Sequence, residues 1–145
     1  MFLGGAKHTL DAKGRLIIPA KYREALGEEF VIAKGLDGCL FVYPMNEWQE
    51  LEQKLRSLPL TQKEARAFAR FFFSGANEGE MDKQGRLIIP QELREYAHLT
   101  KDCKVVGVNN RLEIWDLATW EDYNTEGEES IEQLAEIMGE HGWGF

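Results

Sequence analysis

The segment Asp11-Ala12-Lys13-Gly14-Arg15-Leu16-Ile17-Ile18-Pro19 recurs 71 positions later as Asp82-Lys83-Gln84-Gly85-Arg86-Leu87-Ile88-Ile89-Pro90. Seven of the nine positions are identical, and they include Gly and Pro at fixed offsets as well as common aliphatic residues. Self-similarity at a fixed offset is the signature of a duplicated structural unit. The chain is therefore predicted to contain two related halves, with a pseudo-two-fold axis inside one polypeptide.

Each copy of the segment predicts a hairpin followed by a short helix. Asp at the first position and Gly at the fourth favour a type I turn whose last residue adopts a left-handed conformation. The turn joins a strand through residues 8–10 to a strand through residues 16–18, where Pro19 ends the pairing. Helices are expected directly after the two prolines, over residues 20–26 and 91–97.

The duplication extends beyond the nine-residue core. Strands over residues 30–32 and 40–43 flank a Gly-rich turn, and residues 103–108 and 112–115 repeat them around Asn109-Asn110. Trp48 has a counterpart in Trp120 once one residue of slippage is allowed. Both halves are thus predicted to share one order of elements.

Two helices are predicted between the halves, and a third in the tail. Asn46 is expected to cap a helix over residues 47–58 that Pro59 ends. Thr61-Gln62-Lys63-Glu64 has the pattern of a capping box and predicts a helix that closes at Gly75. Apolar residues at helical spacing predict a marginal amphipathic helix over residues 125–138.

These patterns divide the chain into four parts: a first repeat over residues 5–47, a helical insert over 48–75, a second repeat over 76–119 and an acidic tail over 120–145. The 145 residues are 43% hydrophobic and 29% charged, as in a globular protein. No window is apolar enough for a membrane helix and no leader opens the sequence, so we expect a cytoplasmic protein without a membrane partner. Cys39 and Cys103 are expected to be buried thiols, with no metal or other cofactor.

Charge is distributed unevenly along the sequence. The net charge is -8, yet residues 112–145 hold ten acidic and no basic residues. The first 26 residues hold five basic and two acidic residues, a local balance of +3. A locally basic surface attracts phosphate even in an acidic protein.

The turn chemistry leaves certain residues of each copy without a structural explanation. Asp11, Gly14, Asp82 and Gly85 form and orient the turns, whereas the cations and amides beside them are not required there. A long cation at a hairpin tip can grip phosphate, and the planar fork of Arg can also hydrogen-bond guanine. The alternative is an ion pair between Asp11 and Arg15 that only closes the hairpin. Duplication favours the binding interpretation, because two linked tips bind more strongly than one. The DNA-binding candidates are Arg15, Lys13, Lys7, Arg86, Lys83 and Gln84.

The sequence has no catalytic motif comparable in strength to the repeated turn segment. The sequence contains no nucleophile triad, no Gly-rich phosphate loop and no metal-ligand spacing of histidines, so we predict neither an enzyme nor a small-molecule substrate. The phenylalanines at positions 68 and 71–73 suggest a stacking platform for single strands, but core or subunit contact is the favoured interpretation.

The two Asp-x-x-x-Arg copies, each followed by Leu-Ile-Ile-Pro, together with residues 65–75 between them, resemble the MraZ family over about the first 120 residues. The resemblance implies an α+β fold in which two domains like those of AbrB and SpoVT form a duplicated swapped-hairpin β-barrel, an internal pseudo-dimer with flanking helices. It implies a nucleoid-associated transcriptional regulator that assembles into a homo-oligomeric ring. Such a protein binds repeated double-stranded DNA boxes upstream of the division and cell-wall gene cluster.

The resemblance assigns DNA contact to both turns, with Arg15 and Arg86 as the leading residues. Residues 72–97 hold three basic and five acidic residues, against the +3 balance of the opening segment. We therefore expect the first copy to contribute more to phosphate attraction and the second more to assembly or register. The rival hypothesis is a ring-forming structural protein for which DNA binding is incidental.

Overall fold

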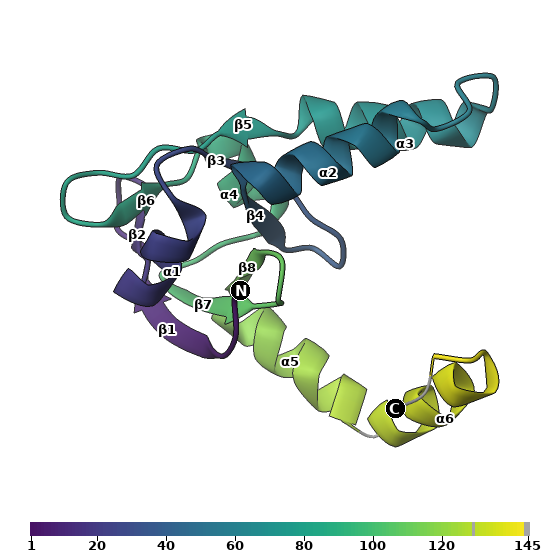
Figure 1. Ribbon diagram of the computed structural model, residues 1–145. Coiled ribbons are helices and arrows are strands. Elements are labelled where there is room, and N and C mark those ends of the chain that lie inside the picture. Colours follow the sequence, from purple (N-terminus) through teal and green to yellow (C-terminus); the bar gives the residue numbers. More distant parts are fainter. Residues whose placement is uncertain (129, 144–145) are drawn as a thin grey trace.

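The computed structural model describes residues 1–128 and 130–143 as an α+β fold, which confirms the predicted class (Figure 1). Residues 129, 144 and 145 of the predicted acidic tail lie outside the described residues. The described strands are all antiparallel to their neighbours. None of the described helices is both long and apolar enough to cross a membrane.

The two halves repeat one order of elements. The first half consists of β1 (Gly5–Thr9), β2 (Arg15–Ile17), α1 (Ala20–Leu26), β3 (Phe30–Lys34) and β4 (Leu40–Pro44). The second half consists of β5 (Asn77–Glu78), β6 (Arg86–Ile88), α4 (Gln91–Tyr96), β7 (Asp102–Gly107) and β8 (Leu112–Asp116). The hairpin of α2 (Met45–Arg56) and α3 (Lys63–Ser74) connects them, and α5 (Leu117–Glu128) and α6 (Ile131–Glu140) follow.

The strands of the two halves are interleaved. The larger sheet has the order β1-β7-β8-β4-β3-β5, and β2 pairs with β6 in a separate ribbon. The counterparts in the two halves are β1 and β5, β3 and β7, and β4 and β8. Exchanging each strand for its counterpart gives the same order read from the opposite edge of the sheet. The chain therefore has the internal pseudo-two-fold symmetry that the repeat predicts.

The predicted hairpin is correct at its turn and wrong in the pairing of its arms. β1 pairs with β7 of the second half, and β2 pairs with β6, also of the second half. Within each half only single bridges, Leu10 to Leu16 and Met81 to Leu87, join the two arms. The strands exchange partners because this arrangement places Leu16 opposite Leu87, both fully buried, at the centre of the molecule.

A single closed barrel is not found among the described residues. The larger sheet is open, with β1 and β5 at its edges, and the β2–β6 ribbon is a second sheet. Next to each turn the strand pairing is reduced to a single bridge, Leu10 to Leu16 in the first half and Met81 to Leu87 in the second. The strand pairings therefore support an α+β fold with exchanged strands, and the swapped-hairpin barrel stays a prediction.

The main core lies between the larger sheet, the ribbon and the two short helices. Tyr22 from α1 and Leu93 from α4 are almost completely buried beside Leu16 and Leu87. Cys103 belongs to this core, and Cys39 is buried in the second core described below. Both cysteines are free thiols, as predicted, and burial raises the pKa of Cys103 to about 12.

A second apolar cluster covers the other face of the larger sheet, beneath α2, α3 and α5. It contains Trp48, Phe72 and Trp115, with Trp120 packed against it. Phe72 is buried, as the core interpretation of the phenylalanines predicts, whereas Phe68 and Phe73 remain 44% and 40% exposed.

The helices α2 and α3 do not start at the residues that the capping patterns predict. α2 begins at Met45, so Asn46 lies inside the first turn; Pro44 occupies the cap position in an extended conformation, with a φ of -63° and a ψ of 157°. α3 begins at Lys63 after Gln62, without the side-chain bond that a Thr61 capping box requires. α2 also ends at Arg56, before Pro59. The single tail helix predicted over residues 125–138 is instead divided between α5 and α6.

Candidate nucleic-acid interface

The first turn is built around the carboxylate of Asp11. Its Oδ1 accepts the backbone N–H of Lys13 at 3.0 Å and that of Arg15 at 2.8 Å, and its Oδ2 accepts Nε–H of Arg15 at 2.6 Å. The N–H of Gly14 closes the turn on the carbonyl of Asp11 at 3.0 Å. Gly14 has a φ of +78°, the left-handed conformation that the sequence predicts.

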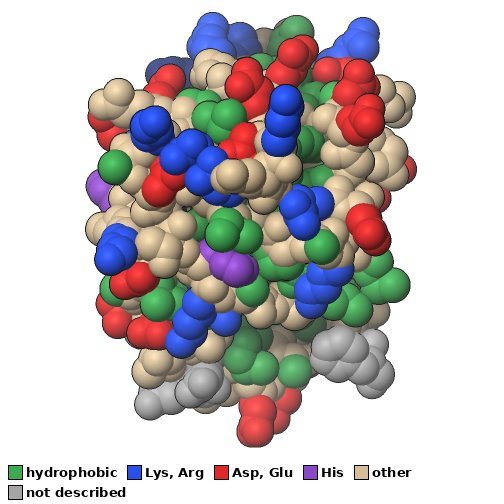
Figure 2. All heavy atoms as spheres, turned by 90° about the vertical axis from the view of Figure 1, so that its left-hand side faces the viewer, with side chains coloured by type: hydrophobic (Ala, Val, Ile, Leu, Met, Phe, Trp, Pro, Cys, Tyr) green, Lys and Arg blue, Asp and Glu red, His purple; other side chains and the backbone are tan. Residues whose placement is uncertain are grey.

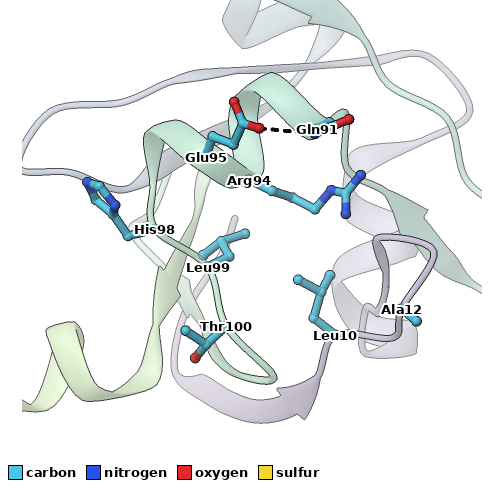
Figure 3. Close-up of a pocket in the computed structure, with 8 residues that line it drawn as sticks. All are labelled: Leu10, Ala12, Gln91, Arg94, Glu95, His98, Leu99 and Thr100. Atoms are coloured by element: carbon cyan, nitrogen blue, oxygen red, sulfur yellow. Dashed lines mark hydrogen bonds between the residues drawn. The ribbon is translucent and has the colours of Figure 1, made fainter.

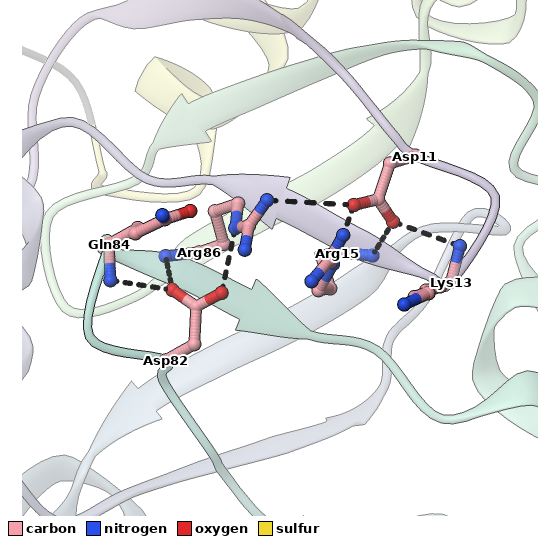
Figure 4. Close-up of polar contacts among 6 residues, drawn as sticks. All are labelled: Asp11, Lys13, Arg15, Asp82, Gln84 and Arg86. Carbon is pink, nitrogen blue, oxygen red and sulfur yellow. Dashed lines mark hydrogen bonds and ion pairs between the residues drawn. The ribbon is translucent and has the colours of Figure 1, made fainter.

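The second turn repeats this geometry around Asp82. Oδ1 accepts the N–H groups of Gln84 and Arg86, both at 2.9 Å, and Oδ2 accepts Nε–H of Arg86 at 2.7 Å (Figure 4). Gly85 has a φ of +77°. The structural role of Asp and Gly is therefore the same in both copies.

These hydrogen bonds keep both aspartates ionised. The backbone N–H of Arg15 is the main cause of a lowered pKa for Asp11, and the backbone N–H of Arg86 lowers the pKa of Asp82 in the same way. The side-chain bonds to the same arginines add to the effect. At neutral pH each turn is thus a fixed pair of opposite charges.

Pairing of β2 with β6 places the two arginines on one face. Arg15 lies opposite Ile88, Leu16 opposite Leu87, and Ile17 opposite Arg86. Because strand side chains alternate, the two leucines point into the core and the other four residues share the outer face. Arg86 lies between the two aspartates, with Nη1 at 3.9 Å from Oδ2 of Asp11 (Figure 4).

The predicted ion pair between Asp11 and Arg15 is present, but it does not use all the N–H donors of the arginine. The side chains of Arg15 and Arg86 are 29% and 24% exposed, and each engages its own aspartate through Nε. A guanidinium has five N–H donors in a rigid fork. The carboxylate therefore fixes the arginine while leaving terminal N–H groups for another partner.

Arg23 and Arg94 also reach the turns, which the sequence reasoning missed. A Cβ on Gly85 would overlap the guanidinium of Arg23, and one on Gly14 would lie 2.8 Å from Cζ of Arg94. Each arginine comes from the half opposite to the turn it covers. Their positions differ by 71, the offset of the repeat, and that offset was the signal that could have found them.

The remaining candidates are placed less uniformly. Lys13 and Gln84 occupy equivalent positions, with their backbone N–H groups bound to Asp11 and Asp82, and Lys83 is an exposed residue of the second turn. Lys7 is not part of this group: it lies on β1, with Nζ at 3.9 Å from Glu121 of α5. Figure 2 views this end of the molecule and shows Lys and Arg side chains across it, interspersed with acidic and apolar ones.

A shallow open groove adjoins the first turn (Figure 3). Its volume is about 910 Å³, and Arg94 extends across it from α4 toward Ala12. Within the described residues, no group of three or more His, Cys, Asp or Glu side chains is arranged to hold a metal ion. The polar feature that stands out at this end is the array of arginines around the two turns.

Comparison with known proteins gives a consistent result. A family described as "MraZ protein, putative antitoxin-like" matches residues 1–71 and again residues 72–140. A protein of Desulforamulus reducens is 60% identical over 136 residues, covering 94% of this chain and 96% of its own. One of Desulfitobacterium hafniense is 61% identical over 138 residues, covering 95% and 96%. Both relatives are named as transcriptional regulators, not as enzymes. The double match and the near-complete coverage establish that this chain belongs to the MraZ family.

Proposed function

We propose that the chain is a transcriptional regulator that binds double-stranded DNA through the β2–β6 ribbon and its two turns. The observation that carries the proposal is the pairing of β2 with β6, which brings two aspartate-anchored arginines from distant sequence positions to one face. The names of the relatives support the same class of function.

The arrangement suits DNA because it presents positioned cations. An arginine held by a carboxylate loses little conformational freedom on binding, and its fork can contact a phosphate or the O6 and N7 atoms of guanine. A two-stranded ribbon is narrow enough to enter the major groove. Arg15 and Arg86 are the proposed leading contacts, with Lys13, Lys83 and Gln84 beside them and Lys7 as an outlying cation.

The target and the assembly state belong to the same proposal. The target is a set of repeated boxes upstream of the division and cell-wall gene cluster, bound by a ring of subunits associated with the nucleoid. Several weakly basic tips engaged together would explain how a chain of net charge -8 holds DNA. The acidic helices α5 and α6 support this arrangement, because they project away from the ribbon (Figure 1).

The proposed domain division follows the repeat: residues 5–47 and 76–119 are the two DNA-binding units, 48–75 the insert and 120–145 the tail. Strand exchange between the halves supports a swapped-hairpin pseudo-dimer of the AbrB type.

Gel-shift binding to DNA from the region upstream of the chain's own gene tests the proposal. The Arg15→Ala, Arg86→Ala double variant should lose specific binding, and an Arg15→Lys variant should lose part of it, because the charge remains but the fork does not. Circular dichroism and thermal unfolding show whether each variant is folded. Undiminished binding by a folded double variant would remove the ribbon from the mechanism and favour the rival, a structural ring.

A further inference from the structure

The C-terminal helix α6 lacks a packing partner in the described chain. Ile131, Leu134, Ile137 and Met138 are 44% to 59% exposed, and none of the residues in α6 is buried. A helix of ten residues is marginal in water unless its apolar face is covered. Among the described residues, no surface of the same copy buries this apolar face.

A second uncovered apolar surface lies on the α2–α3 hairpin. Leu60 at its tip is 62% exposed, and Phe68 and Phe73 on α3 are also exposed. Phe68 packs on the buried Phe72 with ring centroids 4.8 Å apart, so its ring presents a fixed face. The outer end of the hairpin projects beyond the sheet (Figure 1).

The two surfaces carry opposite charge. Residues 54–70, at the outer end of the hairpin, contain five basic residues and one acidic residue, a balance of +4, whereas α6 contains three acidic residues and no basic one. Opposite potentials attract and orient two surfaces, and like potentials penalise the pairing of either surface with itself. Charge thus favours contact between α6 and the hairpin over contact between two identical elements.

We propose that α6 of one copy docks on the α2–α3 hairpin of a second copy of this chain, head to tail. The inference deepens the proposed homo-oligomer and rests on it. In Figure 1 the hairpin and α6 project at opposite ends of the side that faces away from β2 and β6. A contact between different patches can repeat from copy to copy and close into a ring, and this one leaves the turns uncovered.

Mixing two variants that each block one surface tests the pairing. Leu134→Glu disables α6 and leaves the hairpin intact, whereas Phe68→Glu disables the hairpin and leaves α6 intact. The wild type should have a mass several times that of one chain by light scattering, and each variant alone should be a monomer. The 1:1 mixture should form a heterodimer that grows no further, because one complementary pair of surfaces remains.

Matched controls carry the same added charge outside these apolar side chains: Gln133→Glu on α6 and Ala67→Glu on α3. Both should keep the wild-type mass. A monomeric wild type, single variants of unchanged mass, or monomeric variants that fail to combine would each overturn the pairing. The readout needs no DNA, so a failure of DNA binding by an intact oligomer would refute the proposed function and leave this inference standing.

Discussion

The two turns have nearly the same geometry and different chemistry. Corresponding hydrogen bonds of Asp11 and Asp82 agree to 0.1 Å, and the φ angles of Gly14 and Gly85 differ by 1°. The positions between them differ: Ala12 and Lys13 in the first copy are replaced by Lys83 and Gln84 in the second. Identical residues fix the backbone, and the side chains that face outward are free to vary.

The charge around each turn in the folded chain differs from the charge of the sequence window that contains it. By sequence window the first copy is the more basic, but Arg23 covers the second turn and Arg94 covers the first. Each turn therefore combines two cations and one carboxylate of its own copy with one arginine of the other half: Lys13, Arg15 and Asp11 with Arg94, and Lys83, Arg86 and Asp82 with Arg23. The asymmetry that remains is the contact of Arg86 with both aspartates, against one for Arg15 among the described residues.

The largest effect is expected from a Cβ at the turn glycines. Gly14→Ala and Gly85→Ala should each lower the free energy of unfolding by about 2 kcal/mol or more, since a left-handed φ costs about 1–2 kcal/mol and the Cβ also meets an arginine. Gly38→Ala is the matched control, because Gly38 has a φ of +79° in open space. Urea unfolding measures all three. Equal losses would show that the covering arginines simply move aside.

The next effect separates the two arginines. Arg15→Ala should reduce DNA affinity by about 1–3 kcal/mol, and Arg86→Ala by less, because part of Arg86 is already engaged by Asp11. Fluorescence anisotropy with a labelled operator measures both, with Lys104→Ala on β7 as a control outside the turns. A greater loss for Arg86→Ala would reverse the ranking of the copies.

A reciprocal exchange sharpens the comparison at the varied position. Lys13→Gln should make the first turn resemble the second, and Gln84→Lys should do the opposite. If each lysine contacts one phosphate, the slope of log affinity against log salt should change by about 0.9 in magnitude, becoming shallower for Lys13→Gln and steeper for Gln84→Lys. Titration over a range of salt concentrations measures the slope. Unchanged slopes would place these residues away from the phosphates.

The smallest effect is expected from pH. The folded-state pKa values of Asp11 and Asp82 are lowered, so the stabilisation from the ionised turns is present above the unfolded pKa of about 3.9 and is lost as the pH falls through the folded value. Asp11→Asn should be less stable than the wild type at pH 7, and the difference should shrink in acid. Urea unfolding at a series of pH values measures it. A difference that stays constant with pH would assign the loss to packing.

Much of the local structure could be predicted from single residues. The turns, the helix that starts after Pro19 and the left-handed glycines follow from backbone preferences that operate within a few residues. The starts of α2 and α3 could not be predicted in this way, because neither helix has a side-chain bond at its cap, and Trp48 and Phe72 pack them on the sheet. The charge of Lys7 suggests a place beside the turns, but β1 places its Nζ 3.9 Å from Glu121 of α5.

The sequence by itself determined that the chain is duplicated, where each turn lies and which residues shape it, since these depend on identity and short-range sterics. Only the tertiary structure decided that each arm pairs with the opposite half. It also decided that Arg23 covers the second turn and Arg94 the first. The physical reason is that burial of Leu16 against Leu87 joins residues 71 positions apart, and a local pattern carries no information about that partner. The face that carries Arg15 and Arg86 is a product of this pairing.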